Sequence, residues 1–127
     1  MTKSNSDTPV ALTPNAIYIL RRRYLARDSH GRVAEEPAAL FRRVAHVAAE
    51  AEGVYSSNTN IQDWEDKFYG VMTRLEFLPN SPTLLNAGRL SGQLSSCFML
   101  PVADSVANIF STLRQAALVH ESGGGTG

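Results

Sequence analysis

The spacing of apolar residues predicts an N-terminal run of three helices. The first begins after Thr13, because threonine caps helices and Pro14 is tolerated at the first helical position. A polar turn at residues 28–31 ends it. Residues 1–12 are polar, and we expect them to form a disordered tail. The apolar positions expected to face the core of this helix are Ile17, Leu20 and Tyr24.

A second helix is predicted from Pro37 and a third after the polar loop at residues 56–60. Gly53 is the expected C-terminal cap of the second helix, and Pro79 is expected to end the third. The second helix has an apolar stripe of Leu40, Val44, Val47 and Ala51, widened by Phe41, Ala45 and Ala48. The third helix has the clearest stripe of the chain, formed by Ile61, Trp64, Phe68, Val71 and Leu75. Residues 13–78 therefore read as an all-α region.

Residues 79–127 follow a different pattern. An irregular connection is expected up to Gly92, then a short buried strand within residues 94–102, then a helix capped by Asp104 or Ser105. No remaining segment reads as a good partner for that strand, although a strand needs one to satisfy its backbone. This incomplete sheet and the glycine-rich end of the chain lead us to expect a fragment of a larger fold. The last helix should face inward with Val106, Ile109, Phe110, Leu113 and Ala117.

Composition narrows the function classes. Twelve basic and twelve acidic residues cancel, so bulk charge favours neither nucleic acid nor membrane as a partner, and the cluster at residues 21–23 is a weak nucleic-acid signal. The N-terminus has no secretory pattern and the chain has one cysteine, which together predict a cytoplasmic protein. We expect no metal site, because the three histidines lie in separate segments: His30, His46 and His120.

Three features carry candidate chemistry, and the residues alone leave each of them open. Cys97 is either an inert packed side chain or a redox thiol that needs a second thiol. The glycine run at residues 122–127 is either a phosphate cradle, or a flexible tail or helix cap. Asp104 is either a helix cap or a ligand contact.

Several motifs in one order distinguish this sequence from a generic helical chain. They are N-S-P-T-L at 80–84, N-A-G at 86–88, Q-L-S-S-C-F at 93–98, D-S at 104–105 and S-G-G-G-T-G at 122–127. The combination resembles the large catalytic subunit of ribonucleotide reductases at the start of the catalytic barrel. The lead-in from residue 13 is most similar to the all-α N-terminal region of the adenosylcobalamin-dependent, class II branch.

This resemblance implies a fold and a set of site residues. The fold would be an α-rich region of three helices, followed by the first strand and helix of the reductase-type α/β barrel, truncated after residue 127. Cys97 would be the reducing cysteine, oxidised to a disulfide with a cysteine outside this chain. The resemblance assigns the substrate contacts to Thr83, Ser96, Cys97 and Gly125, and the allosteric effector contacts to Asp104, Ser105 and Val106.

The resemblance also implies partners. These are a ribonucleotide substrate, a deoxynucleoside triphosphate effector and a thioredoxin-type reductant. The chain is expected to be a truncated frame, a cloned piece or one half of a split gene, and in the last case a downstream polypeptide would complete the barrel. Adenosylcobalamin would be the cofactor, bound largely outside these residues. Only one cysteine of the active site is present, so we expect the chain alone to be inactive. The alternative is a non-catalytic helical interaction module, or a relic derived from a reductase.

Overall fold

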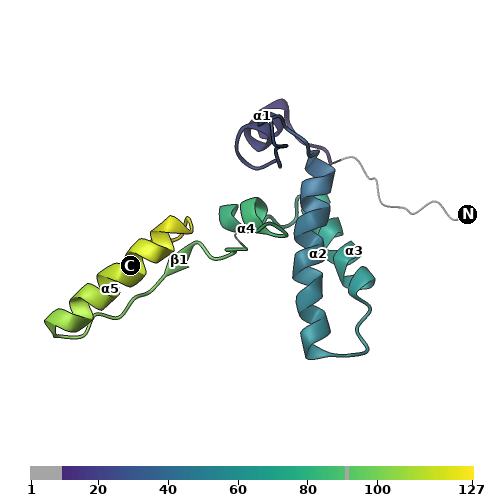
Figure 1. The fold of residues 1–127 in the computed structure, drawn as a ribbon. Coiled ribbons are helices and arrows are strands. Elements are labelled where there is room, and N and C mark those ends of the chain that lie inside the picture. The colour runs from purple at the N-terminus through teal and green to yellow at the C-terminus, as the bar shows by residue number, and fades with distance from the viewer. Residues whose placement is uncertain (1–9, 91) are drawn as a thin grey trace, which may run out of the picture. The chain divides into compact units, whose positions relative to one another are not determined.

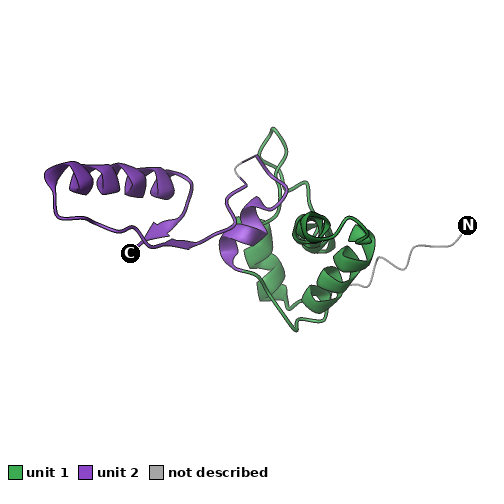
Figure 2. Ribbon diagram, turned by 90° about the horizontal axis from the view of Figure 1, so that it is seen from below, with its two compact units in different colours: residues 1–79 green, residues 80–127 purple. Residues whose placement is uncertain are grey.

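The computed structural model describes residues 10–90 and 92–127 of the chain. The chain divides into unit 1, residues 1–79, and unit 2, residues 80–127 (Figure 2). Most of the tail predicted at residues 1–12 lies outside the described residues. In the part that is described, no helix is long and apolar enough to cross a membrane.

Helix α1, Pro14–Arg23, begins as predicted, because the side chain of Thr13 accepts a hydrogen bond from the amide of Ala16. A loop then returns the chain to helix α2, Pro37–Tyr55. The carboxylate of Glu35 orders this loop by accepting from the Ala26 amide at 2.8 Å and from Arg43 Nε at 2.8 Å. Both bonds link segments distant in the sequence, so neither could be predicted from local spacing.

Helix α3, Ile61–Thr73, runs antiparallel to α2, and this pair makes the main helix–helix contact of unit 1 (Figure 1). Asn60 caps α3 by accepting from the Gln62 amide. The buried apolar side chains of unit 1 are Leu20, Leu25, Leu40, Phe41, Val44, Ala45, Ala49, Tyr69 and Met72. The core therefore centres on the first half of α2, while Ala48 and Ala51, predicted to face inward, are exposed.

Three predicted helix ends in unit 1 are wrong. Helix α1 ends at Arg23, before the polar turn at residues 28–31, because the amides of Tyr24 and Leu25 both donate to the carbonyl of Leu20 and close the last turn. Helix α2 continues through Gly53 to Tyr55, and a Cβ added at Gly53 would lie only 3.4 Å from Ile61 Cδ1. Gly53 therefore lies within α2, where even a Cβ would make only an ordinary contact with Ile61, and it does not end the helix. Helix α3 stops at Thr73, well before Pro79, because Leu75 adopts a left-handed conformation with φ of 59°.

An ionic cluster lies between α2 and α3 (residues Arg42, His46, Glu50, Glu65 and Asp66). Its centre is the buried carboxylate of Glu65, which lies 2.8 Å from His46 Nδ1 and 3.3 Å from Arg42 Nη1. Arg42 also stacks 3.8 Å over the centre of the Tyr69 ring and bonds Asp66 at 2.6 Å. Glu65 is thus buried with partners, as a buried charge requires.

The hydrogen bond to Glu65 raises the pKa of His46 above its ordinary value, and Glu50 adds to this effect. Stabilisation from the charged imidazole is therefore fully present below its unfolded pKa and is lost as the pH rises through the folded pKa. We expect unit 1 to lose a few tenths of a kcal/mol between about pH 6 and pH 8, because the His46 side chain is 53% exposed and its ion pair is screened. Denaturant unfolding at several pH values would measure this. His46→Ala should flatten the profile and His30→Ala should preserve it; an unchanged slope in His46→Ala would contradict the assignment.

Unit 2 begins with a helix where an irregular connection was expected. Helix α4, Ser81–Asn86, forms because Asn80 accepts from the Thr83 amide at 2.9 Å and Pro82 occupies the first turn. The prediction of an irregular segment up to Gly92 is therefore wrong over α4. The Pro and Asn residues that indicated a turn act here as helix-starting residues.

The rest of unit 2 is a strand–helix–strand arrangement. Strand β1, Cys97–Phe98, pairs in parallel with strand β2, Gly125–Thr126, and helix α5, Val106–Glu121, connects them. The expected strand within residues 94–102 is thus much shorter than predicted. The expectation that the sequence lacks a partner strand is wrong, because the glycine run supplies one.

Helix α5 forms where predicted, but its apolar face is not covered. None of its residues is buried within the described chain; Val106, Ile109, Phe110 and Leu113 are each 47% or more exposed. The prediction that these residues face inward is wrong for this chain. Helical periodicity identifies an apolar face, but it cannot say whether a covering surface is present.

Candidate functional site

Cys97 lies in β1 with its side chain exposed to solvent. In the parallel pair, Cys97 is the register partner of Gly125, and Phe98 is the partner of Thr126. The amide of Gly125 donates to the carbonyl of Ser96 at 2.8 Å. The expectation that Cys97 is packed is therefore wrong in this chain, where its thiol is accessible beside a glycine backbone.

The amides of all four glycines in the glycine run donate to carbonyls of the protein. The amide of Gly123 donates to His120 O, that of Gly124 to Val119 O at 2.9 Å, and that of Gly127 to Phe98 O at 3.0 Å. Gly123 has φ of 89° and ends α5, which agrees with the helix-cap interpretation. The interpretation as a phosphate cradle is wrong here, because a cradle needs amides that are free to donate.

Gly124 brings the run into contact with both β1 and α5. A Cβ added there would lie 2.8 Å from Phe98 Cε2 and 2.8 Å from Val119 Cγ1. We expect Gly124→Ala to weaken the β1–β2 pairing by about 1–3 kcal/mol, the cost of overpacking. Hydrogen exchange at the Gly127 amide should be faster in this variant. Gly53→Ala is the matched control, because the same methyl group added there would make only an ordinary contact, 3.4 Å from Ile61 Cδ1. Unchanged exchange in Gly124→Ala would contradict the close packing.

Thr83 is tied to the segment that leads into β1. Its hydroxyl lies 2.6 Å from Asn80 Oδ1 and 3.1 Å from the carbonyl oxygen of Leu94. Next to it, the side chain of Asn86 donates to the carbonyl of Gln93 at 2.8 Å. Asn80, Asn86 and Gln93 are site-building residues that the sequence pattern does not single out by role. For Asn80 the available signal is an asparagine just before a proline in the first helical turn.

The start of α5 holds the three residues expected to contact an effector. Ser105, not Asp104, caps the helix: its Oγ accepts from the Asn108 amide at 3.2 Å and from Asn108 Nδ2 at 2.6 Å. The capping role considered for Asp104 is therefore wrong, and its exposed carboxylate remains available for another contact. Val106 is 73% exposed.

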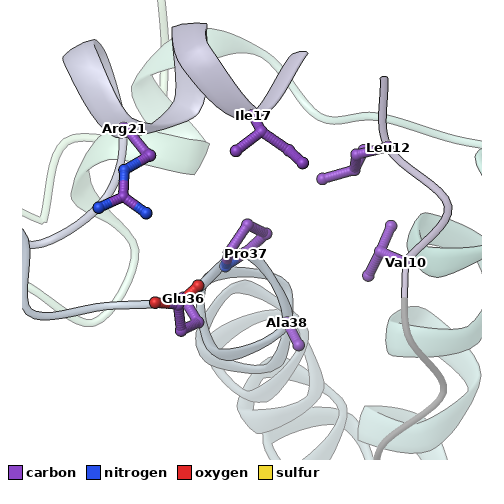
Figure 3. A pocket seen from close by; sticks show the side chains of 7 residues that line it. All are labelled: Val10, Leu12, Ile17, Arg21, Glu36, Pro37 and Ala38. Atoms are coloured by element: carbon purple, nitrogen blue, oxygen red, sulfur yellow. The ribbon is translucent and has the colours of Figure 1, made fainter. Parts of the chain in front are cut away.

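A hollow of about 250 Å³ lies in unit 1 (Figure 3). Arg21 and Glu36 lie at one end of it, and the rest of the lining is apolar: Val10, Leu12, Ile17, Pro37 and Ala38. The described residues include no group of three or more His, Cys, Asp or Glu that could hold a metal ion.

Comparison with known proteins places these observations in a family. Residues 10–92 match the sequence profile described as "Ribonucleotide reductase, all-alpha domain". A vitamin B12-dependent ribonucleoside-diphosphate reductase of Mycobacterium tuberculosis is 46% identical over 112 residues, which are 88% of this chain and 16% of the relative. The corresponding protein of Thermoplasma acidophilum is 34% identical over 170 aligned positions, 91% of this chain and 22% of the relative.

The similarity extends beyond relatives named for vitamin B12. The ribonucleoside-diphosphate reductase large chain 2 of Saccharomyces cerevisiae is 39% identical over 111 residues, 85% of this chain and 11% of the relative. The chain thus spans less than a quarter of the length of each of these relatives.

Proposed function

The chain belongs to the ribonucleotide reductase large-subunit family, and we propose that it contributes one part of an enzyme that reduces ribonucleotides to 2′-deoxyribonucleotides. The observation that carries the proposal is the exposed thiol of Cys97 on β1, held in register with Gly125 of the glycine run. In this proposal residues 13–78 form the all-α region, and residues 79–127 form the beginning of the catalytic α/β barrel.

Cys97 is proposed as a reducing cysteine. Loss of the ribose 2′-hydroxyl as water consumes two electrons and two protons, and two thiols supply both when they become a disulfide. The chain has one cysteine, so the second thiol must come from another segment or polypeptide. Exposure of Cys97 is consistent with this, because a buried thiol could not reach a partner.

Thr83, Ser96 and Gly125 are proposed as substrate contacts around Cys97. The Thr83 hydroxyl donates within the protein, to Asn80 or Leu94, so its lone pairs remain able to accept from a substrate hydroxyl. Gly125 has no side chain to obstruct a ligand beside Cys97. Ser96 contributes its side chain, because its carbonyl is already bonded to the Gly125 amide.

Asp104, Ser105 and Val106 are proposed as the first part of a specificity-effector site for a deoxynucleoside triphosphate. Ser105 supports this by holding the N-terminus of α5, where partial positive charge favours an anionic ligand. The exposed carboxylate of Asp104 could accept from a ribose hydroxyl or a base. Effector binding would then favour one conformation of the neighbouring loops, and that conformation would change the relative affinity for different substrates.

Adenosylcobalamin is proposed as the radical-generating cofactor, because the most similar relatives described above are named vitamin B12-dependent. Its binding site would lie largely outside this chain. A thioredoxin-type reductant would return the cysteine pair to the thiol state. The diphosphate form of the substrate follows only from the names of the relatives.

A hybrid enzyme tests the proposal. Residues 13–127 of this chain would replace the matching segment of the Mycobacterium tuberculosis relative, and deoxyribonucleotide formation would be measured with adenosylcobalamin and a dithiol. We expect activity within about tenfold of the parent enzyme, because a hybrid that keeps the geometry of the site avoids the rate loss of misplaced groups. A misplacement of about 1 Å would cost roughly two orders of magnitude in rate. The isolated 127-residue chain should show none.

A folded hybrid without any activity would contradict the proposal and favour a non-catalytic interaction module. Folding would be checked by circular dichroism and by the elution volume of the hybrid relative to the parent. Deoxyribonucleotide formation by the isolated chain would contradict the requirement for a second thiol.

A further inference from the structure

Gln93 joins three segments of unit 2. Its side-chain oxygen Oε1 accepts from the Ser95 amide at 3.1 Å, and its side-chain nitrogen Nε2 donates to Ser122 Oγ at 3.4 Å. Its backbone carbonyl accepts from Asn86 Nδ2 at 2.8 Å. One residue thus connects the end of α4, the lead-in to β1 and the end of α5.

The direction of each bond follows from the chemistry of the partners. A backbone amide can only donate, so Oε1 must face Ser95 and the NH₂ group must face Ser122. The Ser122 hydroxyl donates to the carbonyl of Val119 at 2.7 Å, so its lone pairs are left to accept from Gln93. Donors and acceptors therefore match at both ends of the side-chain amide.

The side chain of Gln93 is bonded to one residue just before each of the two strands of the candidate site. Ser95 precedes Ser96 and Cys97 on β1, and Ser122 opens the glycine run that forms β2. Leu94 lies between Gln93 and Ser95, and its carbonyl oxygen is 3.1 Å from the Thr83 hydroxyl. Each β strand has only two residues, so the ladder itself contributes few bonds to hold Cys97 against Gly125.

We propose that Gln93 is a positioning residue that sets the register of Cys97 against the glycine run by bridging Ser95 and Ser122. The proposal rests on the proposed function for its catalytic meaning, but its geometry can be tested without any enzyme activity. Glutamine suits the role because it offers an acceptor and a donor on one planar group. Glutamate lacks the donor, and asparagine is one methylene shorter.

Residue-resolved hydrogen exchange on the 127-residue chain tests the proposal, with four variants: Gln93→Ala, Gln93→Glu, Ser122→Ala and the matched control Gln115→Ala on exposed α5. In Gln93→Ala, exchange at the amides of Ser95, Gly125 and Gly127 should be roughly two- to tenfold faster, the effect of losing about one hydrogen bond. Gln115→Ala should leave these three amides unchanged.

The conservative variant separates positioning from general destabilisation. Gln93→Glu keeps an acceptor for Ser95 but places an anion beside the lone pairs of Ser122, so Ser95 should stay protected while Gly125 and Gly127 exchange faster. Ser122→Ala should give the same pattern, and adding it to Gln93→Glu should have little further effect. Equal exchange in Gln93→Ala and the parent would overturn the proposal, as would a uniform increase over α5 and both strands in Gln93→Glu. Neither result would bear on the activity of the hybrid enzyme.

Discussion

Replacing Phe41 by alanine is expected to lower the free energy of unfolding of unit 1 by about 3–5 kcal/mol. Phe41 is 1% exposed and is the largest fully buried side chain of the described residues. It lies on α2 in the segment that contributes most of the buried side chains of unit 1. The loss combines the transfer of a large apolar group to water with the cavity left behind.

Denaturant unfolding followed by circular dichroism at 222 nm would measure this loss. Phe77→Ala is the matched control, because the same chemical change is made at a side chain that is 58% exposed. The control should change the unfolding free energy by less than about 0.5 kcal/mol. Similar losses in the two variants would mean that the α2–α3 core described above does not form in solution.

Replacing Cys97 by serine in the hybrid enzyme is expected to lower deoxyribonucleotide formation by more than ~10³-fold, a scale typical of removing a group that reacts covalently. Serine keeps the size and polarity of the side chain but cannot form a disulfide. Nucleotide affinity should stay within about threefold, because the substitution removes chemistry rather than binding surface. The measurement is initial rate together with equilibrium binding of the substrate.

Ser95→Ala is the control for this experiment. Ser95 is exposed and uses its backbone amide, not its hydroxyl, to bond Gln93, so the rate should change by less than about twofold. Full activity in Cys97→Ser would contradict a reducing role for Cys97 even if the hybrid is an active reductase. Equal losses in both variants would indicate a disturbed β1 rather than lost thiol chemistry.

Helix starts were predictable from the sequence because capping is local. Thr13, Asn60 and Ser105 each accept from an amide two or three residues ahead, which requires no tertiary contact. Asn80 follows the same rule, and its helix was missed because Pro82 was interpreted as a turn residue. Helix ends were less predictable. Helix α2 continues through Gly53, which lies beside Ile61, and α3 ends just before Leu75, which has a left-handed backbone conformation.

The candidate site was only partly predictable. The motif order pointed to Cys97 and Gly125, but their placement as register partners depends on a strand formed by a glycine run. Glycine has low strand propensity, so no local pattern identified β2. Gln93 and Asn86 were missed because they act through residues distant along the chain.

The sequence by itself determined where helices α1, α2, α3 and α5 begin, the family and the position of the single cysteine, because capping, periodicity and motif order are properties of neighbouring residues. Only the tertiary structure decided which apolar faces are covered: α2 buries Leu40 and Phe41, whereas α5 leaves Phe110 exposed. It also decided that the glycine run pairs with β1. Burial and strand pairing depend on which surfaces meet in three dimensions, and a periodic pattern does not contain that information.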